Sequence, residues 1–385
     1  MKIGLVLDDG LDAPDGVQQY ILTVGTWLSK QGHEVHYLVG QTVRDDIKNL
    51  HSLSKNVDVR FNRNRLSIPV SASGARLDVL LQEQKFDVLH VQLPYSPQLA
   101  GKMLRRVSDK TAVVGTFHIL PYGRLQSFGS RVLAKIVSKT LARFDTIVAV
   151  STAARDFAKS RMGIEASVLP NAVNLAAFSE GKKLKQFDDG RQNVVFLGRL
   201  VERKGAMQLL QAVAVLYKRG DFRNRRLIIA GHGPQRPKLD AFIAKHNLQD
   251  SVVMAGWLTE ADKPNYLKTA TVAVLPSMSG ESFGIVLVEA IASGAGVVLA
   301  GDNPGYRYVM DNNEQTLVDP LDTKEFANKL QKLLDNESLR KSLRDQQIAH
   351  IESYDIGVVG PQLEKLYRLA IAKRNHYSDN DTHEQ

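Results

Sequence analysis

Short apolar runs rich in β-branched residues recur along the first 150 positions, and stretches with helical spacing of apolar residues separate them. A strand that is buried on both faces appears in sequence as a continuous apolar run. The pattern therefore predicts a parallel sheet covered by helices on both sides. The predicted strands are residues 2–7, 34–39, 57–61, 87–92, 112–118 and 146–151.

The same alternation restarts in the second half of the chain. Here the predicted strands are residues 193–200, 226–231, 252–257, 272–277 and 295–301. Because ligands of open parallel sheets bind beyond the carboxyl ends of the strands, two such domains would face a common cleft. The predicted fold class is α/β, with two Rossmann-like doubly wound parallel-sheet domains facing an interdomain cleft.

The chain of 385 residues exceeds the size at which one hydrophobic core usually stops growing, which favours two domains. A polar, charged and glycine-containing segment at 179–192 is typical of a linker and offers a hinge. We expect an N-terminal domain over 1–180 and a C-terminal domain over 188–355. An amphipathic helix at 358–375 could pack back onto the first domain, and the polar tail 376–385 is expected to be disordered.

The composition, with 43% hydrophobic and 24% charged residues, is that of an ordinary globular protein. No segment approaches the ~18 consecutive apolar residues of a membrane span. The N-terminus lacks the apolar region of a signal peptide, so a cytoplasmic location is the default. The absence of cysteine excludes disulfides, thiolate metal sites and a cysteine nucleophile.

The net charge of +9 lies entirely in the first half, where residues 1–185 hold 25 Lys and Arg against 16 Asp and Glu. A basic field favours an acidic partner, which could be an anionic membrane surface, a phosphorylated substrate or nucleic acid. The alternative is that the charge serves solubility alone.

The loop at 8–20 leaves the first predicted strand and enters a helix through Gly16. A strand, a glycine turn and a helix N-terminus together can bind an anion, because free backbone N–H groups and the helix dipole point at one spot. The other interpretation is a simple turn in which Asp15 caps the helix. The G-x-G-x-x-G spacing of a dinucleotide site is absent, since Gly10 and Gly16 are six residues apart.

A second candidate loop, GRLVERKG at 198–205, follows the first strand of the second domain. Its basic residues Arg199, Arg203 and Lys204 could clamp a diphosphate and neutralise the charge that develops on a leaving group. A solvated run of charge is the alternative, but a glycine on each side of the cluster favours close approach of a ligand.

Two carboxylates, Glu281 and Glu289, flank an apolar run in SGESFGIVLVEAIASGAG. Glu281 is expected in a loop before a helix and Glu289 about two turns along it, roughly 11 Å away at the helical rise per residue. That separation is too large for joint action on one bond, so the pair would bind two parts of an extended ligand. Alternatively, Glu281 favours the helix N-terminus and Glu289 is an exposed helix residue.

Two features of the first domain complete the candidates. His118 ends the predicted strand 112–118 and could act at the cleft, although a packing or hydrogen-bonding role is the commoner one for such a histidine. Basic residues recur at four-residue steps between 131 and 143, namely Arg131, Lys135, Lys139 and Arg143. This stripe is typical of a membrane-surface helix and equally of a sheet-covering helix with a solvated face.

These motifs together resemble those of retaining GT-B glycosyltransferases of sequence family 4, and the resemblance covers nearly the whole chain. It is carried by the E-x7-E of GESFGIVLVEA, by GRLVERKG and by the glycine turn. The phosphatidylinositol mannosyltransferase branch is the most similar, through DAPDGVQQY, FDVLHVQLP, VGTFH, VAVS and LPNAVNLAAF.

The resemblance implies transfer of a hexose, mannose from GDP-mannose, to a phosphatidylinositol-like lipid, with retained configuration. It implies no bound metal and no cofactor besides the nucleotide-sugar substrate. Arg199 and Lys204 would hold the diphosphate, Glu281 the hexose and Glu289 the ribose. The remaining implied contacts are backbone groups of Phe283, Gly284 and Ile285 to the donor, Gly16 to the diphosphate, and His118 and Gln18 to the reacting centre and acceptor.

Two departures from the family pattern affect these expectations. The first loop has Asp15-Gly16 where the family usually has two glycines, which adds negative charge near the expected diphosphate. The helix expected within 71–86 lacks the strongly basic character of the lipid-acceptor branch. Charge for a peripheral position on the inner membrane face would then come from Arg60, Arg63 and Arg65 or from the stripe at 131–143.

Three other functions are alternatives to this one. A family 4 glycosyltransferase that uses a UDP-sugar in polysaccharide or glycolipid synthesis is the alternative within the class. A dehydrogenase is disfavoured by the missing dinucleotide fingerprint. A nucleic-acid partner is disfavoured because the basic excess lacks interleaved aromatic residues or a reading motif.

Overall fold

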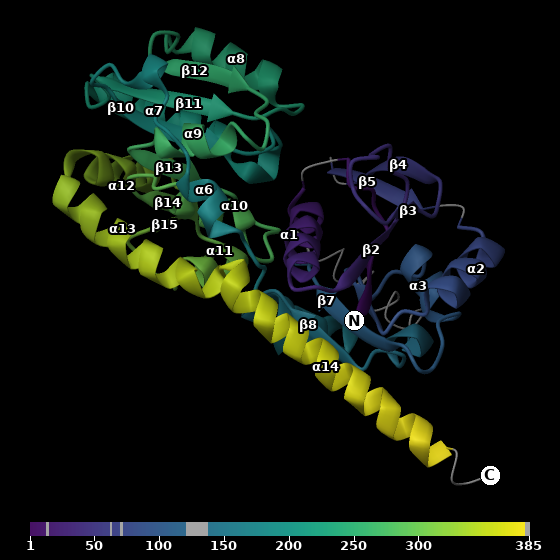
Figure 1. Cartoon of the computed structure of the whole chain (residues 1–385). Coiled ribbons are helices and arrows are strands. Elements are labelled where there is room, and N and C mark those ends of the chain that lie inside the picture. The colour runs from purple at the N-terminus through teal and green to yellow at the C-terminus, as the bar shows by residue number, and fades with distance from the viewer. Residues whose placement is uncertain (13–14, 62–63, 70–71, 121–137, 382–385) are drawn as a thin grey trace. The chain divides into compact units, whose positions relative to one another are not determined.

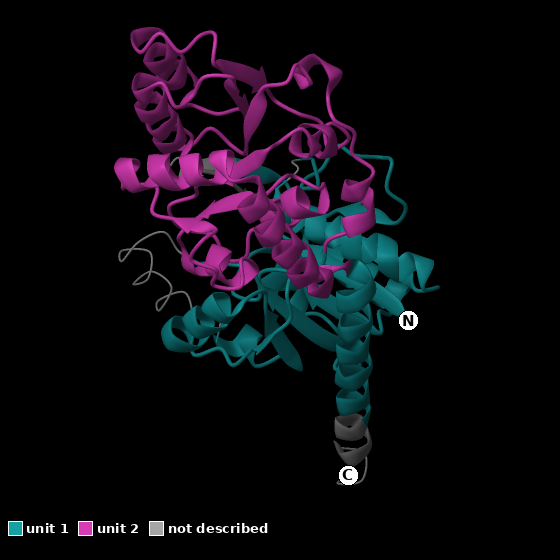
Figure 2. Ribbon diagram, turned by 90° about the vertical axis from the view of Figure 1, so that its left-hand side faces the viewer, with its two compact units in different colours: residues 1–172, 356–385 teal, residues 173–355 magenta. Residues whose placement is uncertain are grey.

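A computed structural model describes the chain except for residues 13–14, 62–63, 70–71, 121–137 and 382–385. The chain divides into two compact units (Figure 2). Unit 1 comprises Met1–Ala172 and Ile356–Gln385, and unit 2 comprises Val173–Asp355. Each unit is built around its own parallel sheet, as the two series of apolar runs predicted.

Unit 1 holds a seven-stranded sheet with the order β3-β2-β1-β6-β7-β8-β9, in which every neighbouring pair is parallel (Figure 1). The strands are β1 (Lys2–Leu7), β2 (Glu34–Val39), β3 (Leu50–Ser52), β6 (Val88–Val91), β7 (Ala112–Phe117), β8 (Thr146–Ala149) and β9 (Ser167–Val168). The helices are α1 (Gly16–Lys30), α2 (Gly74–Gln84), α3 (Leu99–Leu104), α5 (Thr152–Phe157), the π-helical turn η1 (Ala158–Met162) and α14 (Ile356–Asp381).

Unit 2 holds a six-stranded parallel sheet with the order β12-β11-β10-β13-β14-β15. The strands are β10 (Gln192–Leu197), β11 (Arg225–Ala230), β12 (Val252–Gly256), β13 (Val272–Leu275), β14 (Val298–Gly301) and β15 (Leu317–Val318). The α-helices are α6 (Leu175–Ser179), α7 (Ala206–Arg219), α8 (Arg236–Lys245), α9 (Lys263–Lys268), α10 (Ile285–Ala292), α11 (Pro304–Val309), α12 (Thr323–Asp335) and α13 (Glu337–Ile351). Short 3₁₀ turns are η2 (Lys185–Phe187), η3 (Glu202–Lys204) and η4 (Glu352–Tyr354).

Alternating side chains of the unit 1 strands enter two separate cores, as the period of two in a strand requires. In β1, Ile3 and Leu5 pack in the core that includes residues of α1 and α14. Val6 packs instead in the core on the other face, with residues of α2 and α3. Burial on both faces explains why these strands appear in the sequence as continuous apolar runs.

One predicted strand does not belong to the sheet. Residues 57–61 fall in β4 (Asn56–Phe61), which pairs antiparallel with β5 (Asn64–Pro69) in a separate hairpin. The alternation Val57, Val59, Phe61 with polar residues between them is the pattern of a hairpin strand and not of a doubly buried one. Strands β3, β5, β9 and β15 were not predicted, because most of them are two or three residues long.

The expected linker at 179–192 is packed onto unit 2. The backbone N–H of Leu184 donates to Thr269 Oγ1 at 2.9 Å, and the side chain of Phe187 is buried against Tyr266. The Arg226 guanidinium lies 5.0 Å from the centre of the Phe187 ring. Phe187 is thus an apolar anchor within this polar run and fixes the segment to unit 2. The boundaries between the two units in the sequence are at 172–173 and 355–356.

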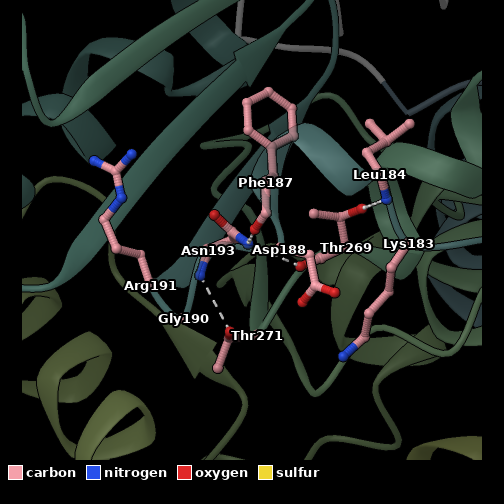
Figure 3. Close-up of a pocket in the computed structure, with 9 residues that line it drawn as sticks. All are labelled: Lys183, Leu184, Phe187, Asp188, Gly190, Arg191, Asn193, Thr269 and Thr271. Carbon is pink, nitrogen blue, oxygen red and sulfur yellow. Dashed lines mark hydrogen bonds between the residues drawn. The ribbon is translucent and has the colours of Figure 1, made fainter.

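This packed segment lines a small pocket of about 130 Å³ beside the beginnings of β10 and β13 (Figure 3). Asn193 on its wall donates through Nδ2 to the carbonyl oxygen of Phe187 at 3.0 Å. Since Asn193 is the second residue of β10 and Thr271 directly precedes β13, the pocket is at the amino edge of the sheet. None of the predicted site residues lines it.

The C-terminal helix α14 belongs to unit 1 and covers the face of its sheet beside α1. A Cβ atom added at Gly360 would lie 2.7 Å from the Trp27 ring, so the two helices are in close contact there. Near the other end, Arg374 pairs with Asp145 at 2.6 Å. Helix α14 continues to Asp381, so residues 376–381, which were expected to be disordered, are helical, and 382–385 lie outside the described residues.

A buried hydrogen bond joins α14 to the sheet, and it generates a testable prediction. The Tyr367 hydroxyl lies 2.7 Å from His90 Nδ1, with both residues fully buried. Tyr367→Phe should lower the free energy of unfolding by about 1–3 kcal/mol, because a buried histidine nitrogen loses its partner. Urea unfolding measures the change. Tyr217→Phe, at a side chain with 41% exposure, is the control and should change little; equal effects of the two variants would contradict the prediction.

Candidate functional site

The basic loop of unit 2 lies against the loop that follows β13. Gly205 has a φ of 76°, and a Cβ atom there would lie 2.1 Å from the carbonyl oxygen of Pro276. Only glycine allows this approach. The backbone N–H of Met278 donates to the carbonyl oxygen of Arg203 at 2.8 Å. The loop ending β10 and the loop ending β13 are thus joined at the carboxyl edge of the sheet.

This junction creates an ion cluster around one carboxylate oxygen. Glu281 Oε1 lies 2.6 Å from Arg203 Nη1 and 2.8 Å from Lys204 Nζ. Ser277 Oγ donates to the same oxygen at 2.7 Å. The three charged side chains are 21%, 17% and 11% exposed for Arg203, Lys204 and Glu281, so water screens their interaction only partly.

The Glu281 carboxylate is held in its ionised form. Burial alone would raise its pKa, but Lys204 and Arg203 outweigh burial, and hydrogen bonds from Lys204 and Ser277 add to their effect. The pKa falls to about 2. Glu281 therefore carries a full negative charge throughout the physiological range and cannot serve as a proton donor there.

Arg199 supplies a further cation after β10. It is half-buried, and among the described residues its side chain forms no ion pair. Arg203 and Lys204 share one carboxylate, and their loop also holds Arg199 and Glu202, so three cations and two acids leave a net positive charge in the group. Such an edge can bind an anionic group, and a diphosphate is one that arginine and lysine recognise.

The residues before α10 offer backbone groups and no reactive side chain. The Phe283 ring is buried and packs edge-on against Tyr354 at 5.1 Å. Gly284 has a φ of 107° and precedes the first helical residue, Ile285. Because the first turn of a helix leaves backbone N–H groups without intrahelical partners, this start can bind an oxygen-rich ligand.

Glu289 is in the second turn of α10, and its burial and pKa differ from those of Glu281. It is 3% exposed, which overturns the alternative that it is an exposed helix residue. Burial raises its pKa to about 7, with Lys263 opposing this shift and Glu260 adding to it. The two acids of the motif therefore have separate environments, one always charged and one titrating near neutrality.

In unit 1, helix α1 begins at Gly16 directly after Asp15. Asp15 is the N-cap residue of α1, as the alternative interpretation expected, but its side chain makes no capping hydrogen bond. Gln18 is buried, and its Nε2 donates to Asp9 Oδ2 at 3.2 Å. Both Asp9 and Gly16 flank the carboxyl end of β1.

His118 directly follows β7 and is buried next to α1. Its ring lies 5.2 Å from that of Tyr20 in an edge-on arrangement, and its Nε2 is 2.9 Å from Gln92 Oε1. Burial lowers the pKa of His118 to about 3. The imidazole is therefore neutral at physiological pH and is a weak base.

The predicted residues thus form two groups, one in each unit. Lys204 and Glu281 are in direct contact in unit 2, and His118 lies beside α1, the helix that carries Gln18, in unit 1. Ser277 and Gln92 were not among the predicted site residues, and Arg203 was predicted only as part of the basic cluster of its loop. Ser277 ends the run VAVLPS and Gln92 ends DVLHVQ, so their position at the ends of predicted strands was the available signal.

The basic stripe at 131–143 is only partly within the described residues, since Arg131 and Lys135 lie outside them, as does Arg63. Lys139 is exposed. Arg143 is not part of a solvated stripe: its side chain is 12% exposed and its Nη2 donates to the carbonyl oxygens of Ser108 and Thr111. In the described part of the chain, no helix is both long and apolar enough to span a bilayer.

The sequence of this chain is similar to those of known proteins. A sequence model of glycosyl transferases group 1 matches residues 178–350, and one of Glycosyltransferase Family 4 matches residues 14–177. A phosphatidyl-myo-inositol mannosyltransferase of Mycolicibacterium smegmatis is 30% identical over 95% of this chain and 93% of its own. The chain belongs to the GT-B glycosyltransferases.

Other relatives of this glycosyltransferase are more distant. An alpha-monoglucosyldiacylglycerol synthase of Streptococcus pneumoniae is 27% identical over 78% of this chain and 71% of its own. The solved structure of sucrose-phosphate synthase from Thermosynechococcus elongatus has a TM-score of 0.76 at 18% identity, covering 97% of this chain and all of its own. This structural likeness confirms the predicted GT-B fold.

The ion cluster of the glycosyltransferase predicts a specific response to diphosphate. Glu281→Gln leaves Arg203 and Lys204 without their counterion and should destabilise the protein by about 3–5 kcal/mol. Inorganic diphosphate should then raise the unfolding temperature of Glu281→Gln more than that of the wild type, because it replaces the lost negative charge.

Thermal unfolding with and without diphosphate measures both effects. Glu314→Gln, which removes the charge of an acid with 71% exposure, is the control and should respond like the wild type. An equal diphosphate shift in the wild type and Glu281→Gln would show that the anion does not bind at these cations.

The raised pKa of Glu289 predicts a pH dependence with a defined sign. Because the pKa of about 7 in the folded chain exceeds that of an unfolded glutamate, the folded state binds this proton more tightly. Stability from this group is complete below the unfolded pKa and is lost as pH rises through about 7. Glu289→Gln cannot ionise and escapes that loss.

The unfolding temperature of Glu289→Gln relative to the wild type should therefore rise between about pH 5 and pH 8. Glu325→Gln, at a side chain with 52% exposure, is the control, and its difference from the wild type should stay nearly constant. A constant difference for Glu289→Gln as well would contradict the burial of an ionisable group at this position.

Proposed function

We propose that this glycosyltransferase transfers mannose from GDP-mannose to a phosphatidylinositol-like lipid with retention of anomeric configuration. The observation that carries the proposal is the ion cluster at the carboxyl edge of unit 2, together with Arg199, which forms no ion pair within the described part of the chain. Six relatives that are 28–30% identical over nearly the whole chain are phosphatidyl-myo-inositol mannosyltransferases, which supports the donor sugar and acceptor class.

Departure of the diphosphate is the step that the cations would assist. The bond between the anomeric carbon and the diphosphate oxygen breaks, and negative charge accumulates on the diphosphate. The acceptor hydroxyl oxygen bonds to the anomeric carbon, and its proton passes to the departing diphosphate. Arg199, Arg203 and Lys204 would stabilise that charge, with backbone N–H groups at the start of α10 adding to their effect. We expect these cations and N–H groups to stabilise the leaving diphosphate without a bound metal.

The two acids would bind different parts of the donor. Glu281 is fixed and ionised, so it can accept hydrogen bonds from hexose hydroxyls while it orients Arg203 and Lys204. Glu289 would accept from the nucleotide ribose. The backbone of Phe283, Gly284 and Ile285 would contact the sugar and phosphates. The buried ring of Phe283 and the missing side chain of Gly284 suit that role.

Unit 1 would supply the acceptor side. His118 and Gln18 are the residues proposed to contact the acceptor, and Gly16 at the start of α1 would allow a close approach of the diphosphate. The excess of basic residues in 1–185 suits a peripheral position on an anionic membrane surface at the cytoplasmic face.

Product analysis with radiolabelled donors tests the proposal. Purified protein is incubated with GDP-mannose, UDP-glucose or ADP-glucose and with vesicles of phosphatidylcholine, with or without phosphatidylinositol. Label in the lipid fraction is expected only with GDP-mannose and phosphatidylinositol. Labelled lipid from UDP-glucose alone would instead establish the UDP-sugar alternative.

Lys204→Ala should reduce turnover by roughly a hundredfold or more, because one charge-assisted contact to the leaving group is lost. Lys218→Ala, at an exposed lysine in the last turn of α7, is the matched control and should keep wild-type turnover. Full activity of Lys204→Ala would contradict the role of the cluster in diphosphate departure.

A further inference from the structure

One face of the unit 1 sheet carries a row of polar side chains toward its carboxyl edge. Val88 of β6 and Val114 of β7 pack in the core that contains residues of α1 and α14. Since side chains two residues apart share a face of a strand, His90 of β6 and Thr116 of β7 continue that face, and Gln92 and His118 extend it directly after the two strands. The strand register places His90 opposite Val114, so the side-chain contacts of His90 with Thr116 and of Gln92 with His118 are diagonal pairs, offset by two residues.

The inner pair is fully hydrogen-bonded. His90 Nε2 lies 2.6 Å from Thr116 Oγ1, and His90 Nδ1 lies 2.7 Å from the Tyr367 hydroxyl. Both ring nitrogens thus have partners. Burial, with a contribution from His118, lowers the pKa of His90 to about 3, so this histidine is a neutral structural residue.

The outer pair has an amide oxygen opposite an imidazole nitrogen. His118 Nε2 is 2.9 Å from Oε1 of Gln92, which is completely buried. An amide oxygen only accepts hydrogen bonds, so Nε2 must carry the hydrogen. In a neutral imidazole the other nitrogen then has a lone pair, which makes His118 Nδ1 a hydrogen-bond acceptor.

The amide of Gln92 has a second, unused group. Among the described residues, its Nε2 is buried without a hydrogen-bond partner. Two amide N–H donors are costly to leave unpaired in a buried position. A hydroxylated ligand would supply the missing acceptor, since each hydroxyl oxygen can accept from an amide while its hydrogen is donated elsewhere.

The geometry points to Gln92 as a positioning residue of the acceptor side. Its Oε1 holds His118 in the Nε2–H tautomer, so that Nδ1 can accept a hydrogen bond from the acceptor hydroxyl. Its Nε2 donates to an oxygen of the same polyhydroxylated acceptor. This inference rests on the proposed acceptor-side role of His118 and adds Gln92 to it.

The role assigned to His118 is orientation of the hydroxyl and not removal of its proton. A ring whose pKa lies near 3 holds a proton too weakly to act as a strong base. A fixed lone pair nevertheless directs the hydroxyl hydrogen, and with it the oxygen that attacks the sugar.

Nuclear magnetic resonance of the full chain with ¹⁵N-labelled histidine tests the tautomer directly. The His118 ring signals are assigned by their loss in His118→Gln, and His90 is an internal reference. We expect wild-type His118 to carry hydrogen on Nε2 alone. In Gln92→Leu the ring should sample both tautomers, while the His90 signals stay unchanged.

A second variant separates the two groups of the amide. Gln92→Glu keeps an acceptor oxygen opposite His118 and lacks the amide donor. The Nε2 atom of His118 should therefore keep its hydrogen in this variant. The KM for the lipid acceptor should rise roughly threefold to tenfold in both variants, with the KM for the sugar donor unchanged, as loss of one hydrogen bond requires.

Gln347→Leu is the matched control, because Gln347 is a buried glutamine of unit 2 whose side chain, among the residues that the structure describes, bonds only to the backbone of Val298. It should leave both the His118 tautomer and the acceptor KM as they are. Hydrogen on Nδ1 in the wild type, or an unchanged tautomer in Gln92→Leu, would overturn the inference. The resonance measurement needs no substrate, so failure of the proposed transfer reaction would be seen separately, in the product analysis.

Discussion

The basic loop of unit 2 is organised around one shared carboxylate oxygen, Glu281 Oε1. Arg203 and Lys204 are neighbours in sequence. Their two positive charges would repel each other unless an anion were placed between them. Glu281 supplies that anion from a different loop, and Ser277 adds a hydrogen bond to it. The contact requires that the loops ending β10 and β13 touch, which in turn requires glycine at position 205.

Unit 1 has neutral polar groups at the carboxyl edge of its sheet, where unit 2 has an ion cluster. Its carboxyl edge places histidine, glutamine and tyrosine side chains under α1 and α14, and burial keeps both histidines uncharged. A charged edge suits a leaving diphosphate, and a neutral edge suits the hydroxyl of an acceptor. The two units of the glycosyltransferase thus have the same sheet architecture and different electrostatics, and the C-terminal helix α14 contributes Tyr367 to the neutral edge.

Much of the fold follows from the sequence, because doubly buried strands are continuous apolar runs. The eleven expected strands all occur, and ten of them are in the two parallel sheets. The hairpin strand at 57–61 was assigned to the wrong sheet because its alternation was short. The segment 179–192 appeared to be a linker because its single anchor, Phe187, is surrounded by polar residues, and burial of one ring cannot be seen in composition.

The residue types of the candidate site could be predicted from the sequence, but the contacts between these residues could not. Spacing placed Lys204 and Glu281 at strand ends, but it could not show that Arg203 and Lys204 share one oxygen. That contact joins residues 78 and 77 positions apart, and it depends on the approach of two loops. Likewise, Gln92 ended a predicted strand as an ordinary polar residue, and only the structure shows its diagonal contact with His118.

The central claim is that the cations of the β10 loop bind a diphosphate. Calorimetric titration of nucleoside diphosphates and monophosphates of guanosine and uridine tests it most directly, in the wild type and in Lys204→Ala. For the base that binds, the diphosphate should bind roughly tenfold to a hundredfold more tightly than the monophosphate, and Lys204→Ala should abolish most of that difference. Equal affinities in the wild type, or a difference that persists in Lys204→Ala, would contradict the account.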